Sequence, residues 1–450
     1  MLPGAALKLP AVLAGSKKYV EDNCVRREVS VDISAKSLAI VVLAVGAAVV
    51  TAYTVGVNQS KKESAATPAS TTTPPPAPQT GAGTIQASAG VAMPAAAHPP
   101  IDANSPSFTH FRVGNRNVKG MVAVEGAVWV GTSGGAIRYD LKTDDYKLFD
   151  VKSGTLLSNG VFHVSKVRQD IVLGTYGGGM SVYNAKEENW KNYNIPDGLA
   201  DQFVYDIDED AKGNYWIATW SGANFVPGGN LDDSSSWKTY TVKNTDGGLP
   251  NDWVYGVEAG KNGEIWFATE GGLARIDSAG KWTNWQHKDG LGAPYEKVKD
   301  DITYTNDPAK ASKHHASQKA EQGIGDDIQV GFNPNYIVSM VVDDDGTVWC
   351  GTWGGGLSHF DGTKWKNYTS KEGLPGNHVF MLNKGKDGNL WIGTNKGLAQ
   401  FKEDGKGFNV YTKAQGLFAD NVFSMAEADD GSLWVGSFGG VARIKNHKKL

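Results

Sequence analysis

The sequence predicts an all-β fold, a seven-bladed β-propeller of four-stranded antiparallel blades, over residues 106–450. A short apolar stretch ending in Gly or Ala and then Thr or Ser occurs seven times, and its clearest copy runs from Leu390 to Thr394. Measured at the Trp position, which is Val172 in the second copy, the copies are 43, 44, 50, 83, 42 and 43 residues apart. A period in the forties built from short strands is typical of a propeller. The 14 Trp and 56 Gly residues fit a fold with large apolar plugs and many tight turns.

Each repeat contains the pattern of four short strands. In the fourth copy the inner strand is expected at 254–257, the Trp-containing strand at 265–269, the third strand at 273–277 and the outer strand at 282–285. Alternating apolar residues bounded by Gly and Asn turns indicate half-buried antiparallel strands. Each repeat is therefore expected to form one blade.

The two ends of the repeat array complement each other. The last copy stops after Val441 to Ile444 without an outer strand, whereas residues 107–112 precede the first inner strand and look like an isolated outer strand. We expect 107–112 to complete the last blade. This pairing would close the ring and remove two open sheet edges, which otherwise invite aggregation.

The N-terminal part predicts a single transmembrane helix. Residues 37–57 carry no charge, and 21 helical residues span roughly 31 Å, enough to cross a bilayer. Because 36 residues precede it, an uncleaved signal-anchor is favoured over a removed signal peptide or a buried soluble helix. Basic residues are more numerous before the helix than after it, which predicts a cytoplasmic tail at 1–36. The propeller is then expected in the periplasm or outside the cell, held at the bacterial inner (cytoplasmic) membrane.

Residues 58–105 are rich in Pro, Ala and Thr and predict a disordered stalk. Such a composition cannot bury a core and favours extended chain. Disorder without a spacing role remains the alternative. Cys24 and Cys350 are expected on opposite sides of the membrane, so they cannot form a disulfide with each other.

The charge and the motifs exclude several functions. A net charge of −4 and a pI near 6.2 give no basic surface for nucleic acid. The sequence lacks the motifs of haem attachment, serine hydrolases, phosphate loops and zinc proteases, so no catalytic residue, metal or cofactor is predicted. His163 and Asp206 occupy equivalent inner-strand positions in neighbouring repeats. A propeller hydrolase or lyase that uses such channel-lining groups is therefore the alternative function.

One face of the predicted propeller, the top face, carries the loops that enter the inner strands together with the turns that follow the Trp-containing strands. Polar residues recur two positions before each inner strand, and after Arg116 in the first repeat they are Asn159, Gln202, Asp252, Asn335, Asn377 and Asp420. These side chains are candidates for ligand binding around the channel mouth. The alternative is that they cap turns by bonding nearby backbone.

Aromatic residues follow the Thr or Ser of the Trp-containing strand in four repeats, namely Tyr176, Trp220, Trp353 and Phe438. A rim of aromatic rings beside amides and carboxylates suits a sugar, an aromatic ligand or a protein loop. Packing between blades is the alternative role. The sequence predicts a ligand-binding site here.

The long step of 83 residues comes from an insertion at 291–333, which enters at the top face and is a candidate lid. It contains His314 and His315. Adjacent histidines on an extended chain point to opposite sides, so they do not predict a metal site. Acidic turns such as 343–346 on the opposite face suggest turn formation rather than calcium binding.

The repeat resembles the two-component regulator propeller repeat of bacterial sensor proteins. The resemblance covers roughly residues 106–446 and is closest at Gly373-Leu374-Pro375, Trp391 to Thr394 and Gly397-Leu398. It implies an extracytoplasmic module for ligand sensing or protein interaction, often on a chain that also carries a histidine kinase. The sequence contains no kinase, regulator or DNA-binding domain, so any signalling is expected to use a separate partner.

The sequence therefore predicts a membrane-anchored extracytoplasmic propeller for ligand sensing or protein docking. The expected partner is a small-molecule or carbohydrate ligand, or a periplasmic or membrane protein.

Overall fold

The computed structural model describes residues 105–302, 306–325, 328, 330–402 and 405–449. The predicted cytoplasmic tail, membrane helix at 37–57 and stalk lie outside the described residues. Within the described part of the chain, no helix is long and apolar enough to cross a membrane.

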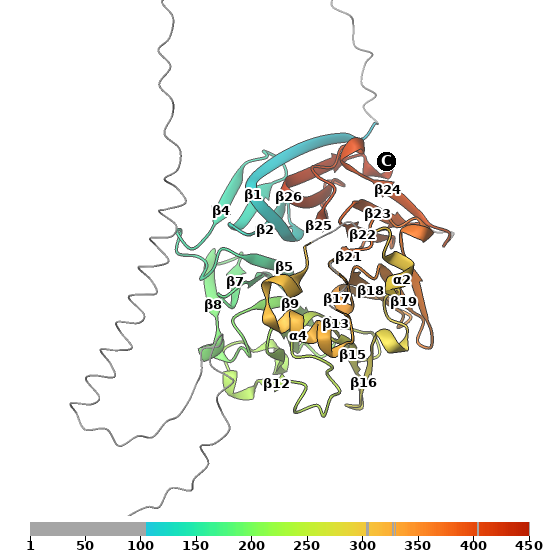
Figure 1. The fold of residues 1–450 in the computed structure, drawn as a ribbon. Helices are drawn as coiled ribbons and strands as arrows, with labels where there is room; N and C mark the ends of the chain where they lie inside the picture. The colour runs from blue at the N-terminus through green and yellow to red at the C-terminus, as the bar shows by residue number, and fades with distance from the viewer. Residues whose placement is uncertain (1–104, 303–305, 326–327, 329, 403–404, 450) are drawn as a thin grey trace, which may run out of the picture. The chain divides into compact units, whose positions relative to one another are not determined.

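Five four-stranded antiparallel sheets are arranged around a common centre (Figure 1). In chain order they are β5 (Val161–Val167), β6 (Asp170–Thr175), β7 (Met180–Asn184) and β8 (Asn189–Tyr193); β9 (Val204–Glu209), β10 (Tyr215–Thr219), β11 (Gly222–Val226) and β12 (Lys238–Tyr240); β13 (Val254–Ala259), β14 (Ile265–Thr269), β15 (Gly272–Ile276) and β16 (Trp282–Trp285); β17 (Asn333–Val342), β18 (Val348–Trp353), β19 (Leu357–Phe360) and β20 (Trp365–Tyr368); and β21 (Val379–Lys384), β22 (Leu390–Thr394), β23 (Gly397–Phe401) and β24 (Phe408–Tyr411).

The sixth sheet has six strands, so the prediction of seven separate four-stranded blades was wrong. Its order is β25 (Val422–Glu427), β26 (Leu433–Lys445), β1 (Ser107–Val124), β2 (Ala127–Thr132), β3 (Gly135–Asp140) and β4 (Tyr146–Phe149). The cause is the length of β1 and β26, with 18 and 13 residues. Each runs on without a break where the repeat pattern placed the end of one strand and the start of another. The first and last repeats are thereby joined into one sheet.

The predicted pairing of residues 107–112 with the last repeat is confirmed. In β1, Ser107 to Arg112 pair antiparallel with Lys445 to Gly440 of β26, while Val118 to Val124 pair with β2. The inner strands contact one another in a closed circle in the order β1, β5, β9, β13, β17, β21 and β25. The N-terminal strand therefore closes the ring.

The Trp-containing strands form the cores between sheets. Trp129, Trp266 and Trp434 are fully buried. Trp129 stacks on Phe149 and Trp266 on Trp285, in each case from the second strand of a sheet to its outer strand. Such large buried side chains dominate core stability. The repeated Trp thus holds each sheet against its neighbour.

The Thr and Gly of the repeat form the turn after this strand. Thr269 Oγ1 donates a hydrogen bond to the carbonyl of Gly272 at 2.7 Å, and Thr132, Thr219 and Thr394 make the equivalent bond. Gly272 has φ of +129°, and a Cβ there would lie 2.4 Å from the carbonyl oxygen of Trp285. Only glycine fits this conformation and this close approach.

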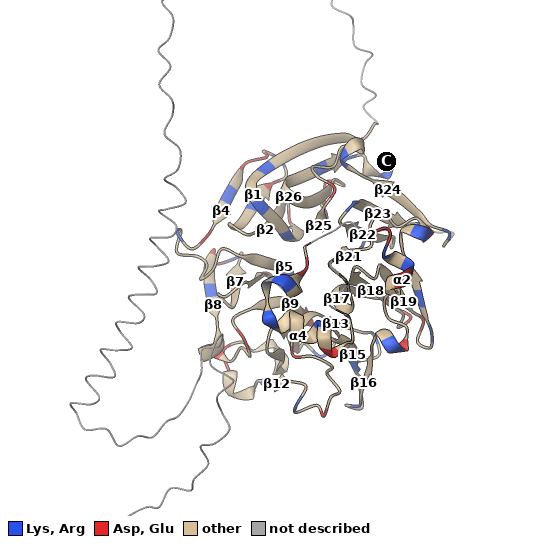
Figure 2. Cartoon of the chain, viewed as in Figure 1, with Lys and Arg blue, Asp and Glu red and all other residues tan. Residues whose placement is uncertain are grey.

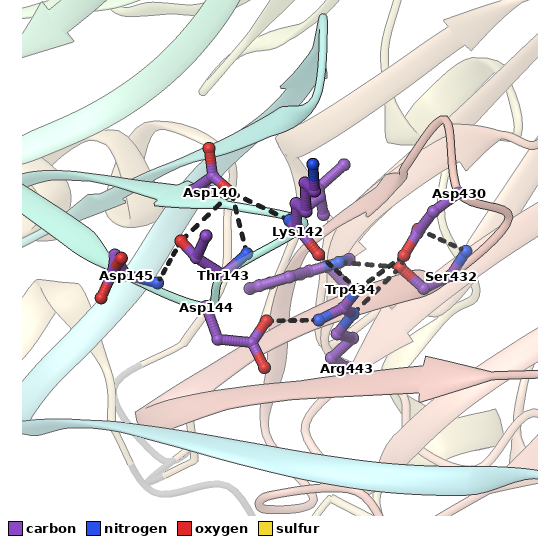
Figure 3. A network of polar contacts seen from close by, with 10 residues as sticks. Asp140, Lys142, Thr143, Asp144, Asp145, Asp430, Ser432, Trp434 and Arg443 are labelled. Atoms are coloured by element: carbon purple, nitrogen blue, oxygen red, sulfur yellow. Dashed lines mark hydrogen bonds and ion pairs between the residues drawn. The ribbon is translucent and has the colours of Figure 1, made fainter.

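A buried arginine fastens the six-stranded sheet (Figure 3). Arg443 on β26 pairs with Asp144 at 2.5 Å and with Asp430 at 2.6 Å, and it donates a further bond to the carbonyl of Leu141. The guanidinium is only 3% exposed. Since Asp144 lies in the turn between β3 and β4, this network joins the C-terminal strand to the first repeat.

Short 3₁₀ helices occur in the loops. Between sheets they are η1 (Ile195–Asp197), η4 (His287–Asp289), η5 (Ser370–Glu372) and η6 (Lys413–Gln415); η2 (Pro227–Gly229) and η3 (Ser234–Ser236) lie between β11 and β12 of one sheet, and η7 (His447–Lys449) follows β26. Four of them, η1, η4, η5 and η6, follow an outer strand, carry a capping box and end at a left-handed Gly. This turn explains the repeated Gly-Leu pair of the sequence, because the Gly ends the helix and the Leu after it is buried, as Leu291 and Leu374 show.

The insertion at 291–333 contains α2 (Tyr295–Val298), α3 (Pro308–Ala311) and α4 (Lys313–Glu321). A small apolar cluster of Ala293, Val298, Ile302 and Phe332 holds its base. The insertion therefore has a small apolar core of its own, and hydrogen bonds such as that from Gly292 N to Ser358 Oγ join it to a sheet.

Candidate ligand-binding site on the top face

A β-bulge near the start of each inner strand turns one side chain toward the central channel. The register shifts between Val161 and His163, for example, and the same shift recurs in β1, β9, β13, β17, β21 and β25. Bulges re-aim side chains and leave the extra residue unpaired. The bulged residues are Lys119, Phe162, Tyr205, Tyr255, Val338, Phe380 and Phe423.

Aromatic rings make a continuous series of contacts around the channel, here called the aromatic band. The series runs from Phe162 to Tyr205 (5.4 Å between ring centroids), Tyr255 (4.9 Å), Tyr336 (4.7 Å), Trp353 (5.5 Å), Phe380 (5.7 Å) and Phe423 (5.1 Å). Lys119 Nζ lies 4.4 Å from the centroid of Phe423, at one end of the series. The band surrounds the channel with flat apolar faces.

Sequence reasoning missed most of this band, although a signal was present. A Val followed by Phe or Tyr opens five inner strands, as in Val161-Phe162 and Val204-Tyr205. In a regular strand the second residue would face a neighbouring sheet. The bulge, which the pattern does not reveal, directs it toward the channel instead.

The structure brings three of the four predicted aromatic residues to the band. Trp353 belongs to it. Trp220 is partly exposed, stacks on Trp253 at 4.3 Å and lies 6.5 Å from Tyr205. Tyr176 is 47% exposed and contacts Phe162 and Trp220. Phe438 is also 47% exposed, but none of its ring contacts within the described residues reaches the band.

The predicted polar residues hold the top loops. Side-chain oxygens of Asn159, Asp252, Asn335, Asn377 and Asp420 each accept a backbone N–H from the loop after the preceding outer strand, and the donors are Val151, Val242, His287, Ser370 and Lys413. Gln202 is exposed, and its backbone carbonyl accepts bonds from Gly177 and Gly179. Five of the six therefore have a capping role that sequence reasoning left open.

The insertion contacts the top face beside the band. His315 Nδ1 lies 2.6 Å from Glu270 Oε1, and the His314 ring stacks on Trp253 at 3.4 Å. Gln318 accepts a bond from Asn251, and Gln322 accepts one from Asn335. The argument from an extended chain was wrong for this pair of histidines because they lie on α4, where both rings contact Trp253.

Burial shapes the charge of these groups. Glu270 has no exposed surface, and burial raises its pKa while the contact with His315 lowers it. Burial lowers the pKa of His314 to about 4, so this imidazole is neutral at pH 7. The neutral His314 ring therefore stacks on Trp253 in the way that a flat aromatic ligand would.

His163 and Asp206 also come together, as their equivalent positions suggested. His163 Nδ1 lies 3.1 Å from Asp206 Oδ1. Burial lowers the pKa of His163 to about 4 and raises that of Asp206 to about 7. Asp206 Oδ2 also accepts the N–H of Val257 at 2.9 Å, which links two inner strands. In the part of the chain described, no three His, Cys, Asp or Glu side chains gather into a metal site.

Comparison with known proteins agrees with the repeat pattern. Residues 198–221, 331–354, 373–396 and 416–439 match the Two component regulator propeller family. A search of curated proteins found no match. The matched segments cover the Trp-containing strands β10, β18, β22 and the start of β26.

Solved structures share the fold at low identity. The extracellular domain of BT3049 from B. thetaiotaomicron, named as a hybrid two component system, has 20% identity and a TM-score of 0.57, with 75% of this chain and 41% of that chain covered. The extracellular domain of BT4673 from the same organism, named as a one component system, gives 16%, 0.53, 75% and 42%. A streptogramin B lyase gives 15%, 0.52, 76% and 97%.

The two extracellular domains come from chains of which this protein covers about two fifths. These likenesses support the all-β propeller architecture, and the family match supports the repeat type. The described part of the chain is therefore an all-β propeller, four segments of which match the Two component regulator propeller repeat.

Proposed function

We propose that the propeller is a sensing module that binds a small-molecule or carbohydrate ligand at the top of the channel. The observation that carries the proposal is the continuous aromatic band, which extends through Trp220 to the exposed ring of Tyr176. Flat aromatic faces bind sugar rings and aromatic ligands, and rigid aromatic side chains supply much of the binding energy at accessible sites. The insertion, docked beside the band, would cover a bound ligand.

The proposal places the propeller outside the cytoplasm. The charge-free residues 37–57 and the basic residues before them support a membrane anchor with a cytoplasmic tail. The extracellular origin of two solved structures with this fold is in keeping with that location. Fractionation of cells should recover the full-length chain in the inner membrane. A soluble mature form that begins after residue 57 would contradict the anchor.

A ligand screen tests the binding site. The full-length chain should melt at a higher temperature with a ligand, because a ligand that binds only the folded state stabilises it by RT ln(1 + [L]/Kd). Trp353→Ala should reduce this shift. Tyr146→Ala is the matched control, because Tyr146 is 70% exposed on the outer strand β4. Equal shifts in both variants would place the ligand elsewhere.

Docking of a separate signalling protein is the other form of this proposal. The same top face would then contact a periplasmic or membrane protein through its exposed rings, Tyr176 and Phe438. Crosslinking from a photoreactive residue at position 176 should capture one partner in cells, and a photoreactive residue at position 146 is the control. Equal capture from both positions would argue against docking at the top face.

A hydrolase or lyase remains a second candidate, favoured by the 3.1 Å contact between His163 and Asp206. The Nε2 atom of His163 is buried and has no hydrogen-bond partner within the described residues, so it could accept a proton. Mass spectrometry separates the functions. A sensed ligand is recovered unchanged after prolonged incubation, whereas an enzyme converts it and His163→Ala stops the conversion.

A further inference from the structure

Strand β1, which contributes both an outer-strand and an inner-strand segment, carries three basic residues near the top face. Between residues 112 and 119, β1 carries Arg112, Arg116 and Lys119, and Figure 2 shows basic positions along this strand. Within the described residues, none of the three lies within 4.0 Å of a carboxylate oxygen. Three cations on one strand without acidic partners attract an anion.

Lys119 is the cation that faces the aromatic band. The bulge between Val118 and Gly120 turns it toward the channel, with its Nζ 4.4 Å from the centre of the Phe423 ring. Burial lowers the pKa of Lys119 to about 8. A partly desolvated ammonium is unfavourable without a partner, and the contact with Phe423 compensates only in part. An anion beside Lys119 would remove this cost.

The acidic side chains near the aromatic band already accept hydrogen bonds. Glu270, on the side of β14, is fully buried and bound by His315 of the insertion at 2.6 Å. The carboxylates of Asp206 and Asp208 each accept a backbone N–H from β13. The charged groups near the band therefore differ by side: Glu270 contacts His315 of the insertion through Oε1, whereas Lys119 on β1 has no carboxylate within 4.0 Å among the described residues.

We propose that the ligand is a small organic anion with a flat apolar body, whose carboxylate pairs with Lys119 while the body contacts the aromatic band. This assignment rests on the proposed ligand-sensing function and names the chemical class of its ligand. Arg116, at the start of the same strand segment, lies with its side chain against Gly134 at the top loop and adds to the attraction.

The observations favour an aromatic carboxylate over two other classes of ligand, a neutral sugar and inorganic phosphate. A neutral sugar would contact the rings but leave Lys119 unpaired. Inorganic phosphate would pair with Lys119 but gain nothing from the seven rings of the band. An aromatic carboxylate uses both, because its flat body stacks on rings and its charge accepts charge-assisted hydrogen bonds.

Matched pairs of probes test the assignment. Benzoate, 4-hydroxybenzoate and naphthalene-2-carboxylate are titrated into the full-length chain by calorimetry, each beside its neutral amide. At least one carboxylate should bind about tenfold or more tightly than its amide, since charged hydrogen bonds add to the shared stacking. Lys119→Met should remove the preference, and Lys119→Arg should keep it.

Lys147→Met is the matched control, because Lys147 Nζ also lies over an aromatic ring, Phe149 at 5.1 Å, but on the outer strand β4. Its affinities should equal those of the original chain. Equal melting temperatures show that the variants are folded. As a second measurement, the carboxylate that binds should protect Lys119 from acylation at pH 8, as read by mass spectrometry of the digested chain.

The outcomes separate the two proposals. If carboxylates and amides bind with equal affinity, and Lys119→Met changes neither affinity, the assignment of an anionic ligand is wrong. The proposal of a ligand site on the aromatic band would still hold. If amides and carboxylates both fail to bind, and Lys119 is acylated equally with and without them, the anion assignment is overturned and only the broader ligand screen bears on sensing. If the preference for the carboxylate over its amide is lost in Lys119→Met but kept in Lys147→Met, the assignment is supported.

Discussion

At the scale of single residues, the structure separates buried aromatic side chains that hold the fold from those that keep exposed surface. Trp266 is 1% exposed and lies between sheets, whereas Trp220 and Trp353 keep partly exposed faces at the channel mouth. The same residue type in neighbouring positions of one repeat thus has two roles. Position relative to the Thr of the Trp-containing strand decides between them.

Replacing these Trp residues should give opposite results. Trp266→Ala is expected to lower the free energy of unfolding by about 3 to 5 kcal/mol, as truncation of a buried Trp does. Trp220→Ala should weaken ligand binding by about 1 to 3 kcal/mol and change stability less. Thermal melting and ligand titration on both variants check this. A large loss of stability without a loss of affinity in Trp220→Ala would show that Trp220 is a core residue and not a binding residue.

Glu258 on β13 should make stability depend on pH. Burial raises its pKa to about 8, and the carboxylates of Asp208, Asp206 and Asp343 add to the effect although a bond from Val342 opposes it. Between the ordinary value of 4.5 and about 8, the folded chain holds a proton that the unfolded chain has lost. The contribution of Glu258 to stability therefore falls as pH rises through this window.

Glu258→Gln should remove this loss. At pH 8 the variant is expected to be more stable than the original chain by roughly 1.4 kcal/mol or more, the value of one pKa unit. At pH 4.5 the two should be nearly equal. Denaturant titrations at both pH values test this, with Glu125→Gln, an exposed carboxylate, as the control. A pH-independent difference between the two chains would contradict the account.

At the scale of elements, the joined sheet depends on contacts far apart in the sequence. Arg443 of β26 satisfies Asp144 and Asp430 and bonds the carbonyl of Leu141. The Arg443 side chain is 3% exposed, but those of Asp144 and Asp430 are 47% and 33% exposed. Water therefore compensates part of the carboxylate charge, and the carbonyl of Leu141 and the two carboxylates lose their hydrogen bonds when Arg443 is removed.

Arg443→Met is accordingly expected to destabilise the propeller by about 1.5 to 3 kcal/mol, the net value of hydrogen bonds to a charged group. Lys142→Met is the matched control, because Lys142 is exposed in the same turn as Asp144 and should change stability by less than about 0.5 kcal/mol. Chemical unfolding of the two variants measures the difference. Equal midpoints would show that the network adds nothing to stability.

The strands could be predicted from the sequence more fully than the sheets. The Trp-containing strand of the fourth copy was expected at 265–269 and is found at Ile265–Thr269, because apolar alternation and the Thr and Gly of the turn define it locally. The continuity of β1 through 113–117 could not be predicted. No alternation marks those residues, and they join two strand segments only because both partners, β26 and β2, are in place.

The site was predicted in outline only. Trp353 and Trp220 were found from their place after the repeat's Thr, but the band needed the bulges, which depend on pairing between strands. The sequence pattern of the amides and carboxylates two positions before the inner strands fits ligand-binding residues and loop caps equally well. Which of the two roles applies depends on where the preceding loop lies in the folded chain, as the hydrogen bond from Ser370 N to Asn377 Oδ1 shows. The sequence pattern does not give that position.

At the scale of the whole molecule, closure of the ring depends on the first strand. A chain that begins at Asn115 lacks residues 107–112 and should expose the edge of β26 between Gly440 and Lys445. It is expected to aggregate or to melt many degrees lower, because unpaired edges recruit other strands. A chain that begins at Ser105 is the control. Sedimentation and melting that agree between the two chains would contradict closure by this strand.

The antiparallel register of Ser107 to Arg112 on β26 also defines how the propeller responds to force. A pull on the chain ahead of residue 105 acts along β1, so the hydrogen bonds of this register share the load in shear instead of opening one after another. The same strand continues to Lys119. Tension on the N-terminal side would therefore be borne by the strand that carries Lys119, so at the proposed site mechanical load and a bound anion would act on one continuous element.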